Sequence, residues 1–431
     1  MFEYTAPARY TTLVMGSTFG AASQKRPLFR KEKPLMSDKE LFAIRIALIQ
    51  AFLRQHGYDG VLLSRLDNFA MATGGKRNYI YTVSDLGFYS LFITREGQVY
   101  YVGDNIEAPR VLAEEIGPFG CEIRKFLWCE GCPADLVKKE FHGALVSDDG
   151  SLGQNVHNDL AYVRALLSQD ELEKYRRLGP LAADAVTAVA KSVRPGDAEA
   201  DIAARLVAEG AKRRCLVPVA LVAADERIAS YRHPLPTEAP LLGSQQAEAR
   251  VRRYVMIVGC FLKEGLIVSI TRFRRVGDTA ATIPDALARI CGVDALAQEA
   301  SQPGKTMGDA FAALQQAYTT MGFPENEWHN HHQGGTTGYA GRTCRAVPGD
   351  PFPILDRRWA KWVKEIASID VEFGHAFAWN PSGVGVKSED TFIMLPDGCK
   401  EIVTRTPEFP NVDLESVLGR PTDVVKSGMM V

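Results

Sequence analysis

Residues 168–193 read SQDELEKYRRLGPLAADAVTAVAKSV, and the rest of the chain can be organised around this stretch. Acidic residues between Asp170 and Glu173 gather near its start, where a helix dipole favours negative charge. Pro195-Gly196 follows directly, as is typical just beyond the end of a helix. The stretch therefore predicts a long helix over Ser168–Val193, and a second helix is predicted over about Ala198–Arg213.

The part of the chain before this helix predicts a small α/β domain. Apolar residues between Leu41 and Leu53 fall on one stripe of a helix over Asp38–Gly57. Three strand-like runs follow it: Gly60–Ser64, Tyr89–Thr94 and Gln98–Val102. Such alternation of helices and strands is typical of α/β domains. We place this domain at residues 37–165, after an N-terminal arm at residues 1–36.

The part after the long helix, residues 166–431, predicts a larger α+β domain. Its strand-like runs are Cys215–Ala223, Tyr254–Leu262, Leu266–Ile270, Ala367–Phe373 and Thr391–Leu395. Lys263-Glu264-Gly265 lies between two of these runs, as a hairpin turn would. Further helices are predicted at Ile283–Cys291 and Met307–Met321. The fold class predicted for the whole chain is α+β.

Composition and charge exclude several classes of protein. The 431 residues are 46% hydrophobic and 24% charged, which is close to a globular average and excludes a disordered chain. Lys and Arg number 50 against 52 Asp and Glu, so no general attraction to nucleic acid or to an anionic membrane is expected. No apolar run reaches the length of about 18 residues that a membrane span needs, and the N-terminal residues do not predict a secretory signal.

The cysteines favour a reducing compartment. Eight cysteines at irregular spacing are too sparse for a disulfide scaffold. Cys129 and Cys132 form one close pair, and no second such pair completes a zinc site. We therefore expect a cytoplasmic protein.

The segment Tyr231–Thr237 contains the first candidate for catalysis. Pro234 and Pro236 hold its backbone extended, which fixes where the His233 ring points. Because histidine titrates near neutral pH, His233 is a candidate general acid or base. The alternative is a surface loop in which this histidine only forms a hydrogen bond.

A glycine-rich segment holds the second group of candidates. It begins Trp328-His329-Asn330-His331-His332-Gln333-Gly334-Gly335 and continues through Gly338–Arg342. In an extended chain, His329 and His331 would share one face and His332 would point to the other. The glycines permit close approach by a ligand or by another strand. The segment is consistent with a metal cluster, with a substrate pocket in which Arg342 holds an anion, or with a packed bend.

Two later segments place polar residues beside an apolar strand. They are Ala378–Ser382, which contains Asn380, and Val386–Thr391. Glu389 comes just before the strand, so it either projects into a cleft or pairs with Lys387. Their composition alone does not decide between these interpretations.

Taken in order, these segments resemble the pita-bread superfamily, which contains creatinase, aminopeptidase P, prolidase and methionine aminopeptidase. The resemblance covers about residues 40–400. It includes Arg65–Phe69 and Asn105-Ile106-Glu107 before the long helix, Asp170–Glu173 within it and Gly196–Glu199 after it. It implies a creatinase-like N-terminal domain followed by a pita-bread domain. It also implies a homodimer in which the partner helps to close the active site.

The peptidases of this superfamily hold two metal ions with two aspartates, one histidine and two glutamates. Carried over to this sequence, the histidine is His332 and the last glutamate is Glu389. The other three ligand positions are replaced, by Val258, Ser269 and Asn380. Two divalent cations are not expected with so few carboxylates, so no metal or other cofactor is predicted. The alternative is a single divalent metal held by His332, Glu389 and another histidine.

Creatinase hydrolyses a C–N bond without a metal, and the resemblance to it implies catalytic roles. His233 matches the histidine that acts there as acid and base. His332 and Glu389 would then serve in substrate binding or proton transfer.

Four further residues are predicted to bind the substrate: His331, Tyr339, Arg342 and Asn380. Arg342 would hold a carboxylate, and Tyr339 would donate to a developing oxyanion. Asn380 cannot pair with a guanidinium as a glutamate would, so creatine itself is not the expected substrate.

The predicted function is therefore metal-independent, creatinase-like hydrolysis of a C–N bond in a small-molecule substrate, although a lyase would have the same sequence features. One alternative is an Xaa-Pro-type metallopeptidase with an altered metal site, which manganese, cobalt or zinc would activate. Another is a non-catalytic binding protein on the peptidase fold, which would tolerate alanine at His233 and Glu389.

Overall fold

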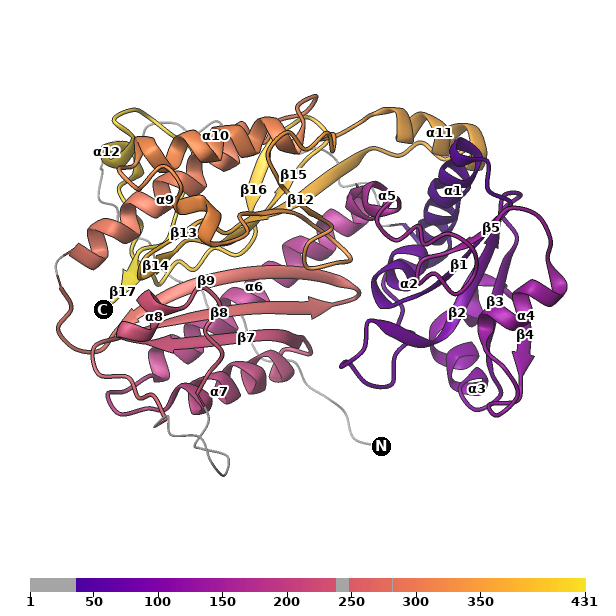
Figure 1. Cartoon of the computed structure of the whole chain (residues 1–431), viewed down its shortest axis with the longest axis horizontal. Coiled ribbons are helices and arrows are strands. Elements are labelled where there is room, and N and C mark those ends of the chain that lie inside the picture. Colours follow the sequence, from indigo (N-terminus) through magenta and orange to yellow (C-terminus); the bar gives the residue numbers. More distant parts are fainter. Residues whose placement is uncertain (1–35, 238–247, 281) are drawn as a thin grey trace, which may run out of the picture. The chain divides into compact units, whose positions relative to one another are not determined.

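The computed structural model describes residues 36–237, 248–280 and 282–431 (Figure 1). The predicted arm at residues 1–36 therefore lies outside the described residues, apart from Met36. Within the described ranges, no helix is both long and apolar enough to span a membrane.

The first described helix, α1 (Asp38–His56), is bounded by its capping residues. Ser37 Oγ accepts from the Glu40 backbone N–H, and the Glu40 carboxylate accepts from the Ser37 backbone in return. Gly57 ends the helix with a φ of 73°, a conformation that glycine adopts without steric penalty. The predicted helix over Asp38–Gly57 is confirmed.

A five-stranded sheet follows, in the order β4-β3-β2-β1-β5. Its strands are β1 (Gly60–Arg65), β2 (Leu86–Thr94), β3 (Val99–Asp104), β4 (Glu122–Phe126) and β5 (Leu145–Ser147). β1, β2 and β3 are antiparallel neighbours, whereas β4 and β5 run parallel to the strands they join. The helices of this part are α2 (Leu66–Thr73), α3 (Ala108–Val111), α4 (Pro133–Glu140) and α5 (Ala161–Ala165). The three predicted strand-like runs are β1, β2 and β3.

The long predicted helix is α6 (Gln169–Ser192), and the second is α7 (Glu199–Lys212). Glu171 Oε2 accepts hydrogen bonds from both the backbone N–H and the Oγ of Ser168, each at 2.8 Å, so a capping box fixes the start of α6. Both helices pack on a four-stranded sheet of order β17-β9-β8-β7 (Figure 1).

This four-stranded sheet contains the predicted hairpin. β8 (Tyr254–Lys263) and β9 (Leu266–Arg275) are antiparallel over their whole length. The turn between them is Glu264-Gly265, with φ values of 50° and 75°, as a two-residue type I′ turn requires. β7 (Leu216–Ala224) pairs with β8, and β17 (Met429–Met430) runs parallel to β9.

A second sheet of this region has the order β11-β10-β12-β15-β16, with β6 pairing with β12. Its strands are β6 (Leu167–Ser168), β10 (Gly334–Thr337), β11 (Cys344–Arg345), β12 (Phe373–Trp379), β15 (Asp390–Met394) and β16 (Lys400–Ile402). The short strands β13 (Ser382–Gly383) and β14 (Val386–Lys387) form a hairpin between β12 and β15. The remaining helices are α8 (Glu226–Ser230), α9 (Thr282–Ala300), α10 (Met307–Thr320), α11 (Arg358–Ala367) and α12 (Leu414–Leu418).

The predicted strand at Ala367–Phe373 is wrong. α11 ends at Ala367, and β12 begins only at Phe373. Val371 and Phe373 are buried in the core and Ile369 packs against it, so their alternation reflects an extended connection with one covered side. The proposed domain boundary at residues 165–166 falls between the five-stranded sheet and the later sheets, and it stays a prediction.

Candidate functional site

Two β-hairpins contain the positions at which this sequence has replaced the predicted ligands of a two-metal site. The register shared by the β12–β15 and β13–β14 pairings sets Asn380 opposite Glu389. In the β8–β9 hairpin, Val258 lies opposite Thr271, and Ser269 lies on the same face of β9 two residues earlier. Thr271 Oγ1 donates to Glu389 Oε2 at 2.8 Å, which joins the two hairpins at this point.

Glu389 is paired with two cations. Arg342 Nη2 donates to Glu389 Oε1 at 2.6 Å, and Lys387 Nζ lies 3.5 Å from Oε2. Arg342 also donates from Nη1 to Ser269 Oγ at 3.2 Å. Burial raises the pKa of Glu389, but Lys387, Arg342 and the Thr271 hydrogen bond outweigh it and lower the pKa to about 2. The carboxylate is therefore ionised at neutral pH.

The residues at these positions do not fit a pair of divalent metal ions. Val258 has no donor atom, and Ser269 and Asn380 offer only neutral donors. The retained carboxylate, Glu389, is already neutralised by its ion pairs. An ammonium and a guanidinium therefore supply the positive charge in this part of the fold.

Three histidines from two loops form a cluster, which we call the histidine cluster: His233, His331 and His332. His233 lies in the loop after α8, whereas His331 and His332 follow the 3-10 turn Glu327–Asn330. His331 Nε2 lies 3.0 Å from His233 Nε2. One ring nitrogen from each of the three histidines lies within 4.8 Å of the others.

The imidazoles of the histidine cluster are kept neutral. The pKa of His332 is lowered to about 3. Burial is the largest cause, and the charge of Arg342 is the second. Burial and then Lys387 lower the pKa of His331 further, and they also lower that of His233. Because the His233–His331 contact joins two ring nitrogens, one imidazole donates and the other accepts.

His329 does not join the histidine cluster, so the predicted alternation along this segment is wrong. Residues Glu327–Asn330 form a 3-10 turn, and extended backbone begins only at His331. The rings of His331 and His332 lie on the same side, with centroids 4.5 Å apart, and not on opposite faces. The ring of His329 packs on Trp328 instead.

Sequence reasoning missed the residues that hold the histidine cluster in position. Gln333 Nε2 donates to the backbone carbonyl of His331 at 2.5 Å. Arg232, the neighbour of His233, forms an ion pair with Glu327, so the two histidine loops are joined. The sequence feature that could have indicated these residues is a polar side chain immediately beside each candidate histidine.

Two predicted substrate-binding residues have contrasting surroundings. The Tyr339 hydroxyl donates to Glu171, a buried carboxylate that also pairs with Arg45. Asn380 is buried, and its Oδ1 has no hydrogen-bond partner among the described residues. The substrate-binding role of Asn380 therefore stays a prediction, whereas the Tyr339 hydroxyl is taken up by a hydrogen bond within the protein.

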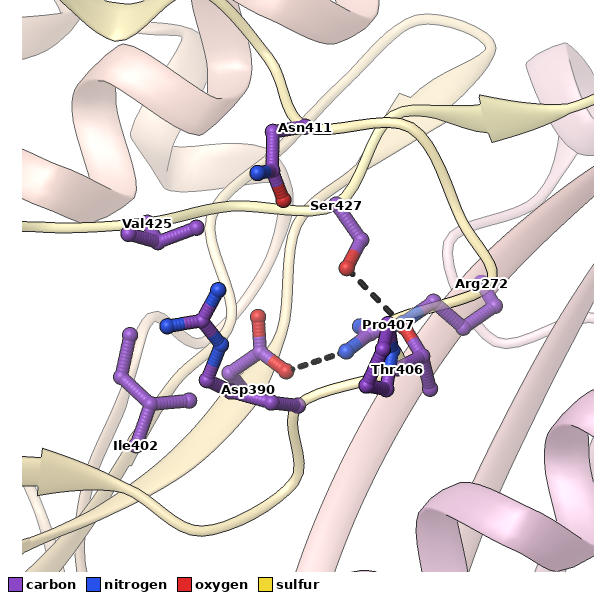
Figure 2. A pocket seen from close by; sticks show the side chains of 9 residues that line it. Arg272, Asp390, Ile402, Thr406, Pro407, Asn411, Val425 and Ser427 are labelled. Atoms are coloured by element: carbon purple, nitrogen blue, oxygen red, sulfur yellow. Dashed lines mark hydrogen bonds and ion pairs between the residues drawn. The ribbon is translucent and has the colours of Figure 1, made fainter. Parts of the chain in front are cut away.

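A small cavity lies at Asp390, the residue after Glu389 (Figure 2). Figure 2 shows Arg272 donating to Asp390, at 2.6 Å, and Thr406 bonded to Ser427, at 3.0 Å. Successive residues of an extended chain point to opposite faces, so Asp390 is directed away from the Glu389 side. The cavity measures about 10 Å³, roughly the space of one water, and it is too small for a substrate.

Comparison with known proteins identifies the fold. No protein-family model and no curated protein matches the chain. Among solved structures, the prolidase from Pyrococcus horikoshii OT3 matches with a TM-score of 0.61 at 17% identity, over 84% of this chain and 98% of the prolidase. The Xaa-Pro dipeptidase from Bacillus anthracis matches with a TM-score of 0.60 at 17% identity, over 85% of this chain and 98% of its own.

A third solved structure extends the fold beyond proteins named as peptidases. The N-terminal domain of the FACT complex subunit SPT16 from Cicer arietinum matches with a TM-score of 0.57 at 9% identity, over 88% of this chain and 98% of that domain. The chain therefore has the pita-bread fold, and the predicted α+β class and resemblance are confirmed at the level of fold. Activity has to be argued from the site itself.

Proposed function

We propose that this chain is a hydrolase that cleaves a C–N bond in a small polar substrate, with His233 as the acid–base catalyst. The observation that carries the proposal is the 3.0 Å contact between His233 Nε2 and His331 Nε2, in a group of imidazoles kept neutral. The shared fold supports hydrolysis at a coarse level, because the matching structures are named as a prolidase and an Xaa-Pro dipeptidase.

In this proposal, His233 takes a proton from the attacking water and returns it to the leaving nitrogen. A general base must be unprotonated but still basic. The His233 side chain is exposed whereas His331 is buried, so desolvation opposes protonation least at His233. His331 orients the His233 ring through the contact between their Nε2 atoms.

Arg342 and Lys387 would supply the positive charge that the reaction needs. When water adds to a carbonyl-type carbon, negative charge develops on the oxygen, and fixed cations in a buried site stabilise it. Glu389 holds both cations in place through its contacts at 2.6 Å and 3.5 Å. Every step is therefore assigned to a side chain of this protein.

The test is a hydrolysis assay on the full-length chain in EDTA. The substrates are a panel of Xaa-Pro dipeptides, N-acyl amino acids and N-carbamoyl amino acids, with the released amine measured by mass spectrometry. We expect turnover in EDTA, and we expect His233→Asn to lower kcat by about 10²–10⁴-fold. His329→Asn, outside the histidine cluster, is the control and should stay within about twofold. Equal turnover by His233→Asn and the control would overturn the proposal.

A peptidase with a single metal ion is the second candidate, and the histidine cluster is the observation that favours it. Three imidazole nitrogens within 4.8 Å match the ligand number of a catalytic zinc site. Their lowered pKa values keep them unprotonated, as metal binding requires. A metal held there would activate a water molecule. Activity that appears only with added zinc, manganese or cobalt would replace the first proposal with this one.

A third function, binding without catalysis, has its own expected outcome. A chain that turns over no substrate with or without metal, and that tolerates His233→Asn, would be a binding protein on this fold.

The homodimer is a proposal that rests on the resemblance alone. Light scattering on the purified chain tests it, with twice the chain mass of 47.4 kDa as the expected result.

A further inference from the structure

Cys129 and Cys132 form an exposed pair of thiols in the part of the chain that contains the five-stranded sheet. All eight cysteines lie in the described residues, and all are free thiols. Five of them are buried or partly buried: Cys121, Cys215, Cys260, Cys291 and Cys344. The exposed ones are Cys129, Cys132 and Cys399. Thiol chemistry requires access to the sulfur, and Cys129 and Cys132 are two accessible thiols three positions apart.

The elements on both sides of the pair hold it in a defined turn. β4 comes before it and pairs in parallel with β3. α4 comes after it and packs Ala134 and Val137 into a small core with residues of β2 and β3 (Figure 1). Between them, the Glu130 backbone N–H donates to the Leu127 carbonyl at 2.8 Å. An anchored strand and an anchored helix therefore fix the backbone on either side of the thiols.

The surroundings of Cys132 suit proton transfer. Its Sγ donates a hydrogen bond to Asp135 Oδ2 at 3.1 Å, so a carboxylate is in position to accept the thiol proton. Cys132 is also the N-cap residue of α4, and a helix N-terminus stabilises a thiolate once the proton has left. Because the hydrogen bond holds the proton on Cys132, the first attack on an oxidant is assigned to Cys129.

An apolar surface lies directly beside the thiols. Leu127 and Trp128 precede Cys129, and they are 50% and 65% exposed. The Trp128 backbone N–H donates to Asn105 Oδ1 at 3.0 Å, which fixes the turn at this residue. Large apolar side chains side by side on a surface are an informative feature, and these two give the carbon atoms of a bound oxidant a surface to pack against.

Two other uses of a cysteine pair fit less well. A structural zinc ion takes four ligands, and the one close group of three or more potential ligands in the described residues is the histidine cluster. A disulfide stabilises a fold more when it closes a longer loop, and this pair would enclose only Glu130 and Gly131. The remaining use of such a pair is exchange between the thiol and the disulfide state.

We propose that Cys129 and Cys132 form a dithiol that exchanges reversibly with a low-molecular-weight disulfide. Cys129 loses its proton to water and attacks one sulfur of that disulfide; the S–S bond breaks, and one thiolate leaves and takes a proton from water. Cys132 then gives its proton to Asp135 and attacks Cys129 Sγ, which releases the second thiolate to take up that proton. The two protein thiols lose two electrons and two protons, and the small disulfide gains them as two thiols. This site goes beyond the proposed function and does not depend on hydrolysis.

The test is mass spectrometry of the full-length chain after exposure to glutathione disulfide. The chain is first fully reduced, and the reaction is stopped with acid before free thiols are alkylated. Trypsin releases both cysteines in one peptide, residues 126–138. We expect this peptide to lose two hydrogen atoms as the internal disulfide forms, and an excess of reduced glutathione should restore them. Cys132→Ser should stop at a glutathione adduct on Cys129.

Cys399→Ser is the matched control, because Cys399 is the other exposed cysteine and has no second cysteine close by in the sequence. It should form the Cys129–Cys132 disulfide at the wild-type rate. A wild-type pair that stays reduced in an excess of glutathione disulfide would overturn the proposal. So would glutathione adducts on both cysteines of the wild type without an internal disulfide.

A metal measurement completes the test. One equivalent of zinc bound to the purified chain and lost in Cys132→Ser would also overturn the proposal, because the pair would then be a metal site. The wild type alone decides whether the internal disulfide forms, so the result does not depend on the folding of a variant. No hydrolysis assay enters the test, so the proposed function can fail while the dithiol stands, and the reverse.

Discussion

Glu389 is a buried carboxylate on which two buried cations depend. The Glu389→Gln variant keeps the size of the side chain but leaves Arg342 and Lys387 without their counter-charge. Removing one partner of a buried ion pair costs about 3–5 kcal/mol, so we expect a loss of that order in the free energy of unfolding. Urea denaturation at neutral pH measures it.

The control for this prediction is Glu401→Gln. Glu401 pairs with Arg176 in a partly exposed position, with side chains 39% and 27% exposed. Partly exposed pairs contribute less than about 1 kcal/mol, so this variant should differ little from the wild type. A Glu389→Gln protein as stable as Glu401→Gln would show that the cations do not need the carboxylate.

His332 links the site to the pH dependence of stability. Its pKa falls from 6.5 to about 3 on folding, mainly through burial, so the unfolded chain binds a proton before the folded chain does. Its contribution to stability is complete above pH 6.5 and is lost as the pH falls towards 3. We expect the Tm to fall less between about pH 7.5 and 5 in His332→Asn than in the wild type or in His329→Asn. Parallel curves for all three proteins would contradict this assignment.

The charged residues of the site show which contacts can be predicted from the sequence and which cannot. The pairing of Lys387 with Glu389, two positions along, is one of two alternatives that the sequence leaves open, and it is present at 3.5 Å. The closer contact from Arg342 joins residues 47 positions apart in the chain, and it depends on the pairing of β10 with β12. No local pattern in the sequence indicates which strands become neighbours, so the shortest ion pair of the site could not be predicted.

At the scale of elements, the neighbours of the two β10 glycines explain why this strand contains glycine. The sequence left open whether a ligand or a strand comes close, and the structure identifies strands. A Cβ on Gly334 would lie 2.2 Å from the Ala378 carbonyl oxygen of β12, and one on Gly335 would lie 2.2 Å from the Cys344 carbonyl oxygen of β11. The two glycines therefore permit close packing of the sheet that supports the histidine cluster.

The Gly334→Ala variant tests this packing. Gly334 has a φ of 93° and a backbone oxygen in the way, so strain and overlap add together. We expect a loss of more than about 3 kcal/mol in the free energy of unfolding, measured with urea. Gly349→Ala is the matched control, because Gly349 has a φ of 70° with nothing within 4 Å. It should cost only about 1–2 kcal/mol for the backbone conformation, and equal losses in the two variants would contradict the overlap.

Strand β9 shows how tertiary partners override local polarity. The strand-like run predicted from the sequence ends at Ile270, before the polar residues Thr271 and Arg272, yet the strand continues to Arg275. Both polar residues are buried, and their partners are the residue before β15 and the first residue of β15. Thr271 donates to Glu389 at 2.8 Å, and Arg272 donates to Asp390 at 2.6 Å. Polarity predicts an exposed end only when no such partner exists elsewhere in the chain.

At the scale of the whole described chain, one buried network joins distant segments. Arg45 of α1 pairs with Glu171 of α6, and Tyr339, in the segment after β10, donates to the same carboxylate. Arg45 also donates to the backbone carbonyl of Leu166 at 2.7 Å. The three side chains are buried, and their separations of 126 and 168 residues put the network beyond any local sequence pattern.

The Tyr339→Phe variant separates the two roles open to this residue. If the hydroxyl serves the network, its loss leaves Glu171 short of one hydrogen bond, and the free energy of unfolding should fall by about 1–3 kcal/mol. Turnover per folded molecule should then stay unchanged. If the hydroxyl instead stabilises an oxyanion, kcat should fall by about 10²–10³-fold with little change in stability. Tyr318→Phe is the matched comparison, because the Tyr318 hydroxyl donates at 2.8 Å to Gln333, which holds His331. A Tyr339→Phe protein that lost turnover at wild-type stability would assign Tyr339 to the reaction and not to the network.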